Sequence, residues 1–397
     1  MSTDRLAILG GRPEYSEPLH VGQLYAPPWD EFKDQFDGIF RRRYFTNHGP
    51  LVSQLEKDLS EFLNCQAICV TNGTLGLMVA LKSLGLSGKV IVPSFTFPAT
   101  VQALYWAGIE PVFCDVDYDT HAISAEHISP LITEEVTGIL YVSLWGGLAD
   151  TTDIERLAEN HSLKLLHDAC HAFAASYAKR SSAQIGDVSV FSLHATKILN
   201  GLEGGIIATS NHEVADQVRT IRNFHSSHTH AAVPLRINAK MSEAQAGMAL
   251  LSLTRVRKNV ENNLLQWQTF YRNLNDIPGI KIYRYDEQCS GNYQYFNFEI
   301  DDVRFGLTRD MLLQCLQSEG IAARRYFSPG VHNLSPYDVL FPQYANTLPN
   351  TDKLCLRTLQ LPIGAMCTID TADRISRLIR MAHDDAHLVK NQLAEMP

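Results

Sequence analysis

The chain of 397 residues is longer than a single hydrophobic core usually supports, so we expect two domains. Its formal net charge of −9 argues against nucleic acid as a partner. Apolar residues make up 45% of the chain, yet no stretch approaches the roughly 20 consecutive apolar residues of a membrane span, which argues against a membrane protein.

The N-terminus and the cysteines indicate a cytoplasmic protein. The first residues lack the basic segment and long apolar run of an export signal. The eight cysteines are scattered without Cys-x-x-Cys spacing, and several lie in apolar runs typical of buried free thiols. Free thiols persist in a reducing compartment, so we expect an intracellular location.

Residues 1–50 predict an arm packed over the body of the protein, because Pro13, Pro18, Pro27 and Pro28 interrupt them. The arm ends in Thr46-Asn-His-Gly-Pro50, which is a strong turn signal. Asn47 and His48 could belong to a site or simply fill the turn, and turn preferences favour neither interpretation.

Residues 51–240 alternate short apolar runs with helical patterns and predict a large domain. Strands separated by crossover helices form a mostly parallel sheet covered on both faces, which predicts an α/β fold. A short helix is expected at residues 152–160. The seven strand candidates lie at residues 67–70, 90–92, 111–115, 138–143, 163–168, 188–192 and 205–209.

A glycine turn after the first strand favours an anion site. The amides of Gly73, Thr74 and Leu75 would begin a helix, where backbone amides and the helix dipole attract a phosphate. Asn-Gly alone is a weak signal, because it is a common turn. After the next strand, Phe97 is either a core side chain or an aromatic face for a ring.

The strand at residues 163–168 ends in Asp168, where a carboxylate would enter a cleft. An aspartate in such a place can keep the ring nitrogen of a pyridine cofactor protonated, although turn chemistry explains strand-end aspartates about as often. His171, three residues further on, could reach the same ring or its phenolic oxygen.

Lys197 stands between small polar residues and a glycine-rich turn. A lysine amine can form a Schiff base with pyridoxal 5′-phosphate (PLP) when burial disfavours its ammonium form. Ser192, His194 and Thr196 could then hydrogen-bond around the cofactor, with Ser192 at its phosphate. Burial statistics alone would place an isolated lysine on the surface, so this hypothesis depends on the other segments.

Beyond residue 240 the pattern becomes helical. Apolar spacing predicts a long helix over residues 241–275 that connects the domains. Residues 276–397 predict a smaller α+β domain, with a strand at 293–300 and helices at 308–319 and 371–394.

Three strings of the sequence resemble the DegT/DnrJ-type PLP-dependent nucleotide-sugar aminotransferases. They are Ser192-Leu-His-Ala-Thr-Lys197 followed by Glu-Gly-Gly, Leu235-Arg-Ile-Asn-Ala-Lys-Met-Ser-Glu-Ala-Gln245, and Arg325-Tyr-Phe-Ser-Pro-Gly-Val-His332. Leu193 replaces the usual aromatic residue of the first string. Relatives with histidine in place of the lysine are sugar dehydratases, and Lys197 separates this chain from that branch.

The resemblance implies an aspartate-aminotransferase-like fold, called fold type I, and an active site shared across a homodimer. The catalytic residues that it implies are Lys197, Asp168 and His171. Further cofactor contacts are Gly73, Thr74, Leu75, Phe97, Ser192 and Asn238, the last reaching across the dimer interface; without the resemblance, Asn238 and Ser242 would be assigned to a helix cap. The substrate contacts are Asn47, His48, His194, Tyr326 and His332.

The resemblance also implies the reaction. Lys197 would move protons while an amino group passes from L-glutamate to the keto group of a nucleotide-linked sugar. The details are most similar to enzymes that convert dTDP-4-dehydro-6-deoxy-D-glucose to dTDP-4-amino-4,6-dideoxy-D-glucose, a deoxyaminosugar of lipopolysaccharide O-antigens. The clusters at residues 41–43 and 324–325 could hold the nucleotide diphosphate.

Three alternatives stay open at this point. A C3-aminating enzyme or a UDP-sugar enzyme would share the same strings, and a non-catalytic regulator could keep the fold and the cofactor. A nicotinamide-dependent dehydrogenase would share the alternation of strands and helices. However, no Gly-x-Gly-x-x-Gly follows the first strand, so the sequence argues against a dehydrogenase.

Overall fold

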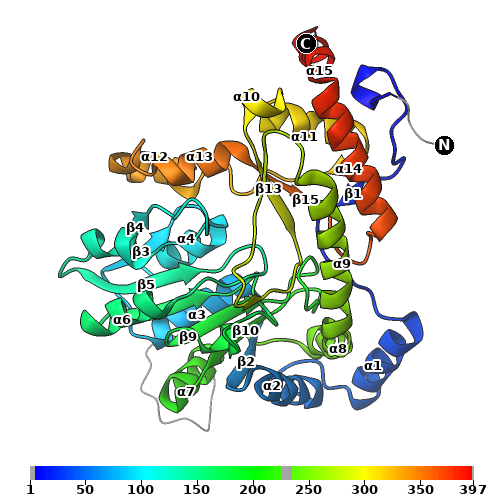
Figure 1. The fold of residues 1–397 in the computed structure, drawn as a ribbon. Coiled ribbons are helices and arrows are strands. Elements are labelled where there is room, and N and C mark those ends of the chain that lie inside the picture. Colours follow the sequence, from blue (N-terminus) through cyan, green and yellow to red (C-terminus); the bar gives the residue numbers. More distant parts are fainter. Residues whose placement is uncertain (1–4, 225–234, 396–397) are drawn as a thin grey trace.

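A seven-stranded sheet forms the centre of the larger part of the molecule (Figure 1). The computed structural model describes residues 5–224 and 235–395. The strand order is β2-β10-β9-β6-β5-β3-β4, and β10 alone runs antiparallel to its two neighbours. The strands are β2 (Gln66–Val70), β3 (Lys89–Pro93), β4 (Glu110–Cys114), β5 (Val136–Val142), β6 (Lys164–Asp168), β9 (Val188–Ser192) and β10 (Gly205–Thr209). The predicted mostly parallel seven-stranded sheet is therefore confirmed.

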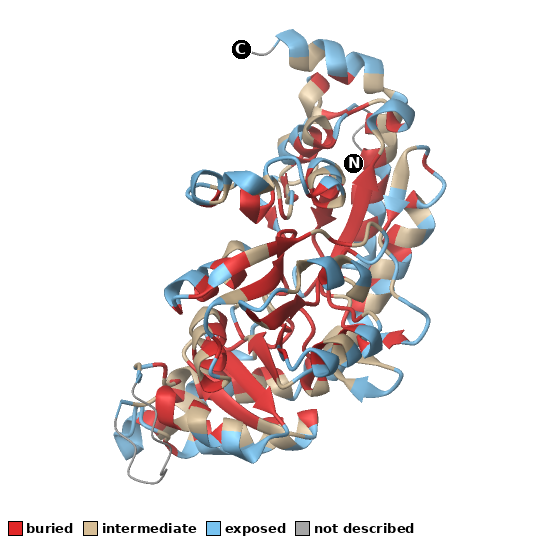
Figure 2. Ribbon diagram, turned by 90° about the vertical axis from the view of Figure 1, so that its left-hand side faces the viewer, coloured by how far each residue is buried: buried red, intermediate tan, exposed pale blue. Residues whose placement is uncertain are grey.

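The strands of this sheet are buried along most of their length, as the red strands of Figure 2 show. Ile91, Leu166 and Ile207 have no exposed surface. Strands covered on both faces consist of nearly continuous apolar runs, which is why the sequence pattern located all seven. The helices of this part are α2 (Pro50–Leu63), α3 (Gly73–Ser83), α4 (Pro98–Trp106), α5 (Ala125–Ile128), α6 (Thr152–Asn160) and α7 (His212–Ile221).

Helix α3 lies close against the sheet, where it contacts β9 and β10. This approach requires Gly76, because a Cβ atom there would lie only 2.9 Å from Cγ1 of Val190. Asn72 caps the helix by accepting a hydrogen bond from the Leu75 amide at 2.9 Å. The N-terminus of α3 is thereby fixed beside the end of β9.

A smaller antiparallel sheet and its helices enclose a second hydrophobic core. Its strands are β11 (Ile280–Ile282), β13 (Phe296–Ile300) and β15 (Thr358–Leu361), and its helices include α11 (Arg309–Ser318), α14 (Ile369–Asp384) and α15 (Ala386–Glu395). The predicted connecting helix is two helices, α8 (Glu243–Leu253) and α9 (Val256–Leu274). The helix predicted at 371–394 is likewise interrupted, at Asp385.

The N-terminal arm contacts both parts of the molecule. Leu6, Leu9 and Leu19 belong to the second core, and β1 (Leu19–His20) pairs with β14 (Ile321–Ala322). The next helix, α1 (Trp29–Arg42), packs against α8. In Figure 1 the start of the arm accordingly lies beside α14 and α15. The domain boundaries proposed from the sequence stay predictions.

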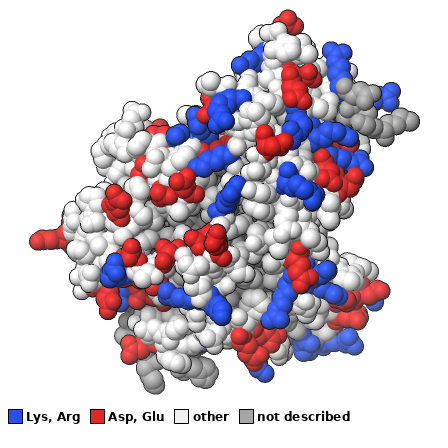
Figure 3. All heavy atoms as spheres, in the orientation of Figure 1, with Lys and Arg blue, Asp and Glu red and all other residues white. Residues whose placement is uncertain are grey.

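Shorter elements complete the described chain. They are β7 (Ser176–Tyr177), β8 (Arg180–Ser181), β12 (Cys289–Ser290), α10 (Asp302–Phe305), α12 (Tyr337–Leu340), α13 (Pro349–Arg357) and the 3-10 turns Ala7–Leu9, Ser129–Leu131, Ser182–Gln184, Val331–Asn333 and Pro342–Tyr344. Within residues 5–224 and 235–395, no helix is both long and apolar enough to cross a membrane. Basic and acidic side chains are interspersed over the face that Figure 3 shows.

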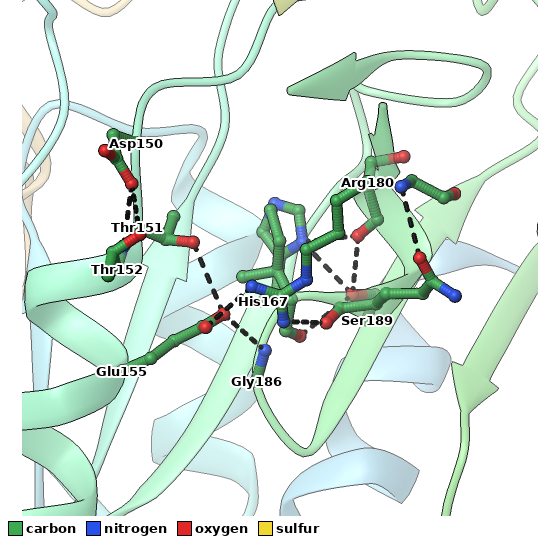
Figure 4. Close-up of polar contacts among 12 residues, drawn as sticks. Asp150, Thr151, Thr152, Glu155, His167, Arg180, Gly186 and Ser189 are labelled. Carbon is green, nitrogen blue, oxygen red and sulfur yellow. Dashed lines mark hydrogen bonds and ion pairs between the residues drawn. The ribbon is translucent and has the colours of Figure 1, made fainter. Parts of the chain in front are cut away.

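A buried histidine, His167, is part of strand β6 in the large sheet. The imidazole of His167 is within hydrogen-bond distance of the Ser143 hydroxyl (2.8 Å), the Ser182 carbonyl (3.0 Å) and the Ser189 hydroxyl (3.1 Å). Figure 4 shows His167 beside Ser189 in this network. Burial disfavours the charged imidazole and lowers the pKa of His167 to about 3.

We therefore expect acid to destabilise the fold through His167. The unfolded chain binds a proton at this residue below the ordinary pKa of 6.5, whereas the folded protein does so only near pH 3. Stabilisation is complete above pH 6.5 and is lost as the pH falls toward 3, by about 1.4 kcal/mol for each pH unit. Urea unfolding at pH 6.5 and at about pH 5 should show a smaller loss for His167→Gln than for the wild type. An equal loss would contradict this assignment.

Candidate active site

A cavity of about 400 Å³ opens at the carboxyl ends of the parallel strands, the usual position of ligand sites in α/β sheets. Segments that are distant in the sequence form its walls. They include residues 72–74 after β2, Phe97 and Thr100 at the start of α4, Asp168 and His171 after β6, Ser192, His194 and Lys197 after β9, and Tyr295, Arg324 and Tyr326.

The N-terminus of α3 forms one end of the cavity. In the described chain, the amides of Gly73 and Thr74 have no hydrogen-bond acceptor, whereas the Leu75 amide donates to Asn72. A Cβ atom on Gly73 would lie 3.2 Å from Cβ of Ser192 and 3.3 Å from Sγ of Cys170, so a side chain would fill this space. Free amides, a helix dipole and the Ser192 hydroxyl suit a phosphate group. The prediction that Leu75 offers its amide to a phosphate is corrected, because the cap uses it.

Asp168 lies buried in the wall of the cavity, 5% exposed. Its Oδ2 accepts a hydrogen bond from the Thr100 hydroxyl at 2.8 Å, and its Oδ1 accepts one from the Cys170 amide at 3.1 Å. One donor belongs to α4 and the other to the turn after β6. Together they fix the orientation of the carboxylate. A buried, fixed carboxylate of this kind can bind the protonated nitrogen of a pyridine ring.

His171 lines the same cavity and is 6% exposed. Burial, with a smaller contribution from the charge of Lys197, lowers the pKa of His171 well below its ordinary value. The Trp145 amide donates to its Nδ1 at 3.4 Å, so the neutral ring carries its proton on Nε2. His171 therefore offers a neutral hydrogen-bond donor at neutral pH.

The amine of Lys197 enters the cavity from the loop between β9 and β10. Its Nζ donates a hydrogen bond to the Tyr295 hydroxyl at 3.2 Å. Burial lowers the pKa of Lys197, but Tyr295 and Cys170 raise it by more, and the net shift is upward. Burial thus favours the neutral amine, as expected, but the neighbouring tyrosine and thiol groups outweigh it in the chain by itself.

Aromatic side chains border the cavity on another side. Phe97 is 51% exposed and its ring centroid lies 6.5 Å from that of Tyr326, so Phe97 is not a core residue. Both residues line the cavity, as does His194, whose Nδ1 lies 2.8 Å from the Thr196 hydroxyl. The structure thus brings these three predicted residues together with Lys197.

Besides Leu75, four predicted residues do not line this cavity. His332 is 2% exposed and lies 2.6 Å from the Ser94 hydroxyl, so we correct its assignment as a substrate contact. The other three are Asn47, His48 and Asn238, which are not among the residues that line the cavity. The side chain of Asn238 accepts a hydrogen bond from Lys240.

Three cavity residues were not found by sequence reasoning as parts of the catalytic centre. Tyr295 precedes β13, and its only sequence signal was strand-like alternation. Thr100 lies in the first turn of α4, and Arg324 was predicted only as part of a basic pair that could hold a nucleotide diphosphate. Their roles follow from contacts across the fold, which the sequence alone does not show.

The residues present fit PLP: Gly73, Thr74 and Ser192 would hold its phosphate, Asp168 its ring nitrogen and Lys197 its aldehyde. This cavity, in a fold consistent with type I, indicates a PLP-dependent enzyme. The DegT/DnrJ/EryC1/StrS aminotransferase family matches residues 29–380, and the chain belongs to this family.

Named relatives are similar over almost their whole length. The dTDP-4-amino-4,6-dideoxy-D-glucose transaminase of Shigella dysenteriae is 33% identical over 366 residues, which are 92% of this chain and 99% of the relative. The Escherichia coli enzyme of the same name is 30% identical over 365 residues, 91% and 98% of the two chains. The structure of DesI in the presence of its TDP-sugar product superimposes with a TM-score of 0.93 at 33% identity, covering 98% of this chain and 99% of DesI.

Proposed function

We propose that the chain transfers the amino group of L-glutamate to C4 of dTDP-4-dehydro-6-deoxy-D-glucose and forms dTDP-4-amino-4,6-dideoxy-D-glucose. This proposal rests on one observation: the Lys197 amine lies in a cavity that also contains Asp168 and the free amides of Gly73 and Thr74. The two relatives named for this product support the choice of substrate.

In this proposal the residues of the chain hold the cofactor and move protons. Lys197 Nζ takes the proton from Cα of the amino donor in the first half of the reaction. In the second half it delivers a proton to the sugar carbon that receives nitrogen. PLP, when bound, supplies a protonated pyridine ring that accepts the electron pair left on carbon, and Asp168 keeps its nitrogen protonated.

The test is a panel of nucleotide-linked keto-sugars offered to the PLP-loaded protein with L-glutamate. We expect the 4-keto dTDP sugar to give the highest kcat/KM, with product mass and nuclear magnetic resonance placing the amine at C4. Faster conversion of a 3-keto sugar or a UDP sugar would support the alternative substrates. Cofactor binding without turnover of any sugar would support a regulator instead.

We also propose that the enzyme is a homodimer whose active sites combine two chains. Glu243 donates its amide to the carbonyl of Phe45 at 3.0 Å, which brings the turn containing Asn47 and His48 close to the segment containing Asn238. Exposed aromatic residues lie in the arm and near Lys240, with Trp29 at 70%, Phe45 at 50% and Phe224 at 60% exposed. An exposed apolar surface of this kind suits contact with a second copy of the chain.

Subunit mixing tests the shared site. Lys197→Ala chains and Asn238→Ala chains, co-expressed with different tags, should form hybrid dimers with one intact site each. Random pairing then predicts about one quarter of wild-type activity in the mixture, because half of the dimers are hybrids with one working site. Co-expression of two differently tagged Lys197→Ala chains is the control. Activity no higher than the sum of the separate variants would contradict the shared site.

The proposed location is the cytoplasm, where the product would be supplied for O-antigen assembly. All eight cysteines are free, which suits a reducing compartment. Fractionation of cells that express the tagged protein would test this location, and recovery with periplasmic markers would contradict it.

A further inference from the structure

Arg324 places an unpaired guanidinium at the active-site cavity. It is partly buried, and the described residues place no carboxylate within ion-pair distance of it. Its Nη1 donates a hydrogen bond to the Tyr326 hydroxyl at 2.8 Å. The neighbouring Arg325 is exposed, does not line the cavity, and lies 3.4 Å from Asp310. The two adjacent arginines therefore have different surroundings.

The backbone of Arg324 is held in place by the smaller sheet. Its amide donates to the carbonyl of Gln360 at 3.1 Å, and the Gln360 amide donates back at 2.8 Å. Gln360 belongs to β15, so the guanidinium extends from a fixed backbone. A planar guanidinium presents several donors in a rigid fork, which suits a carboxylate or a phosphate.

The position of Arg324 distinguishes between these two anions. The cofactor phosphate has its own site at Gly73 and Thr74. Arg324 donates a hydrogen bond to Tyr326, and both residues line the same cavity as the Lys197 amine. The anion must therefore lie near the reacting carbon. An α-carboxylate is bonded directly to the carbon that loses its proton, whereas the diphosphate of a sugar nucleotide is attached at C1, across the ring from C4.

We propose that Arg324 binds the α-carboxylate of the amino donor, with the Tyr326 hydroxyl orienting the guanidinium. The assignment rests on the proposed transamination and adds to it the residue that selects an α-amino acid as donor. Arg325 takes no part in this site. The nucleotide diphosphate must then bind elsewhere, so the pair at residues 324–325 is not its cluster.

The test measures binding of the amino donor separately from the reaction with the nucleotide sugar. We would compare the PLP-loaded wild type with Arg324→Gln and Arg324→Lys, with Arg325→Gln as the matched control. Binding is measured calorimetrically with α-methyl-L-glutamate, which has no Cα hydrogen to lose. We expect Arg324→Gln to raise its Kd by about 10- to 100-fold, the range for a lost hydrogen bond to a charged group. Arg325→Gln should leave the Kd unchanged, and Arg324→Lys should lie between.

The two half-reactions are then followed by the cofactor's absorbance. Loss of rate in Arg324→Gln should be confined to the half-reaction with L-glutamate. The wild type should also discriminate strongly against the α-amide of L-glutamate, and Arg324→Gln should discriminate much less. An unchanged Kd, or a larger loss in the half-reaction with the nucleotide sugar, would overturn the carboxylate site; the latter would assign the guanidinium to the diphosphate.

The outcomes separate this site from the proposed function. A wild type that converts its cofactor with L-glutamate in an Arg324-dependent way but aminates no keto-sugar would support the carboxylate site and contradict the sugar substrate. A wild type that aminates the sugar while its donor half-reaction is insensitive to Arg324→Gln and Arg324→Lys would contradict the carboxylate site alone.

Discussion

Replacing Lys197 by alanine should abolish transamination and leave the fold intact. Lys197 is the only lysine that lines the cavity of the described chain, and no other amine there can bind the cofactor's aldehyde or move the substrate proton. Loss of covalent attachment and of the proton carrier should lower kcat at least about 1000-fold. The side chain is only partly buried and its single side-chain hydrogen bond is to Tyr295, so the cost in stability is small.

Single-turnover kinetics and thermal unfolding measure these two effects. Lys258→Ala is the matched control, because that lysine is 68% exposed on α9 and pairs with Glu261. The control should keep wild-type activity. Reduction with borohydride should label Lys197 in the wild type and no residue in Lys197→Ala. Activity of Lys197→Ala within about 10-fold of the wild type would show that another group carries the proton.

The second large effect is expected for Asp168→Asn. The amide keeps the shape of the carboxylate and can still accept the hydrogen bond from Thr100, but it removes the negative charge. Without that charge the ring nitrogen is no longer held in its protonated form, so kcat should fall about 100- to 1000-fold. The loss should appear in both half-reactions, because both depend on the same ring.

Asp115→Asn is a matched control for Asp168→Asn, since Asp115 directly follows β4 as Asp168 ends β6. Its carboxylate accepts hydrogen bonds from the amides of Asn350 and Thr351 at 3.0 and 2.8 Å, within the first turn of α13. The control should lose up to about 1 kcal/mol of stability and keep its kcat. Similar kcat values for Asp168→Asn and the wild type would remove Asp168 from the catalytic centre.

The large sheet could be predicted because its strands are continuous apolar runs between helical segments. The two helix breaks, between α8 and α9 and between α14 and α15, could not be predicted. The apolar spacing continues through Thr254 and Arg255 and through Asp385, so only the caps in the structure show where each helix ends. The arm was expected to pack over the body, but pairing of Leu19 with Ile321 is a contact across about three quarters of the chain that no local pattern encodes.

Predicted site residues that lie in local motifs come together in one cavity, although their roles stay predictions. Asp168 and Ser192 end strands, and Gly73 and Lys197 follow strands; parallel strands place such ends together. Tyr295 and Arg324 reach the cavity from the second part of the chain, so their contacts depend on how the two parts pack. The string that contains His332 is similar to the family's, yet the imidazole turns to Ser94 and not to the cavity.

Transfer of the amino group can be followed through the nitrogen atom itself. The PLP-loaded enzyme would be given L-glutamate labelled with a heavy nitrogen isotope, followed after removal of free amino acid by dTDP-4-dehydro-6-deoxy-D-glucose. We predict that the label appears as an amine on C4 of the sugar, and that Lys197→Ala gives no labelled sugar. Unlabelled sugar from the wild type, or label at another carbon, would contradict the proposed transfer of nitrogen to C4.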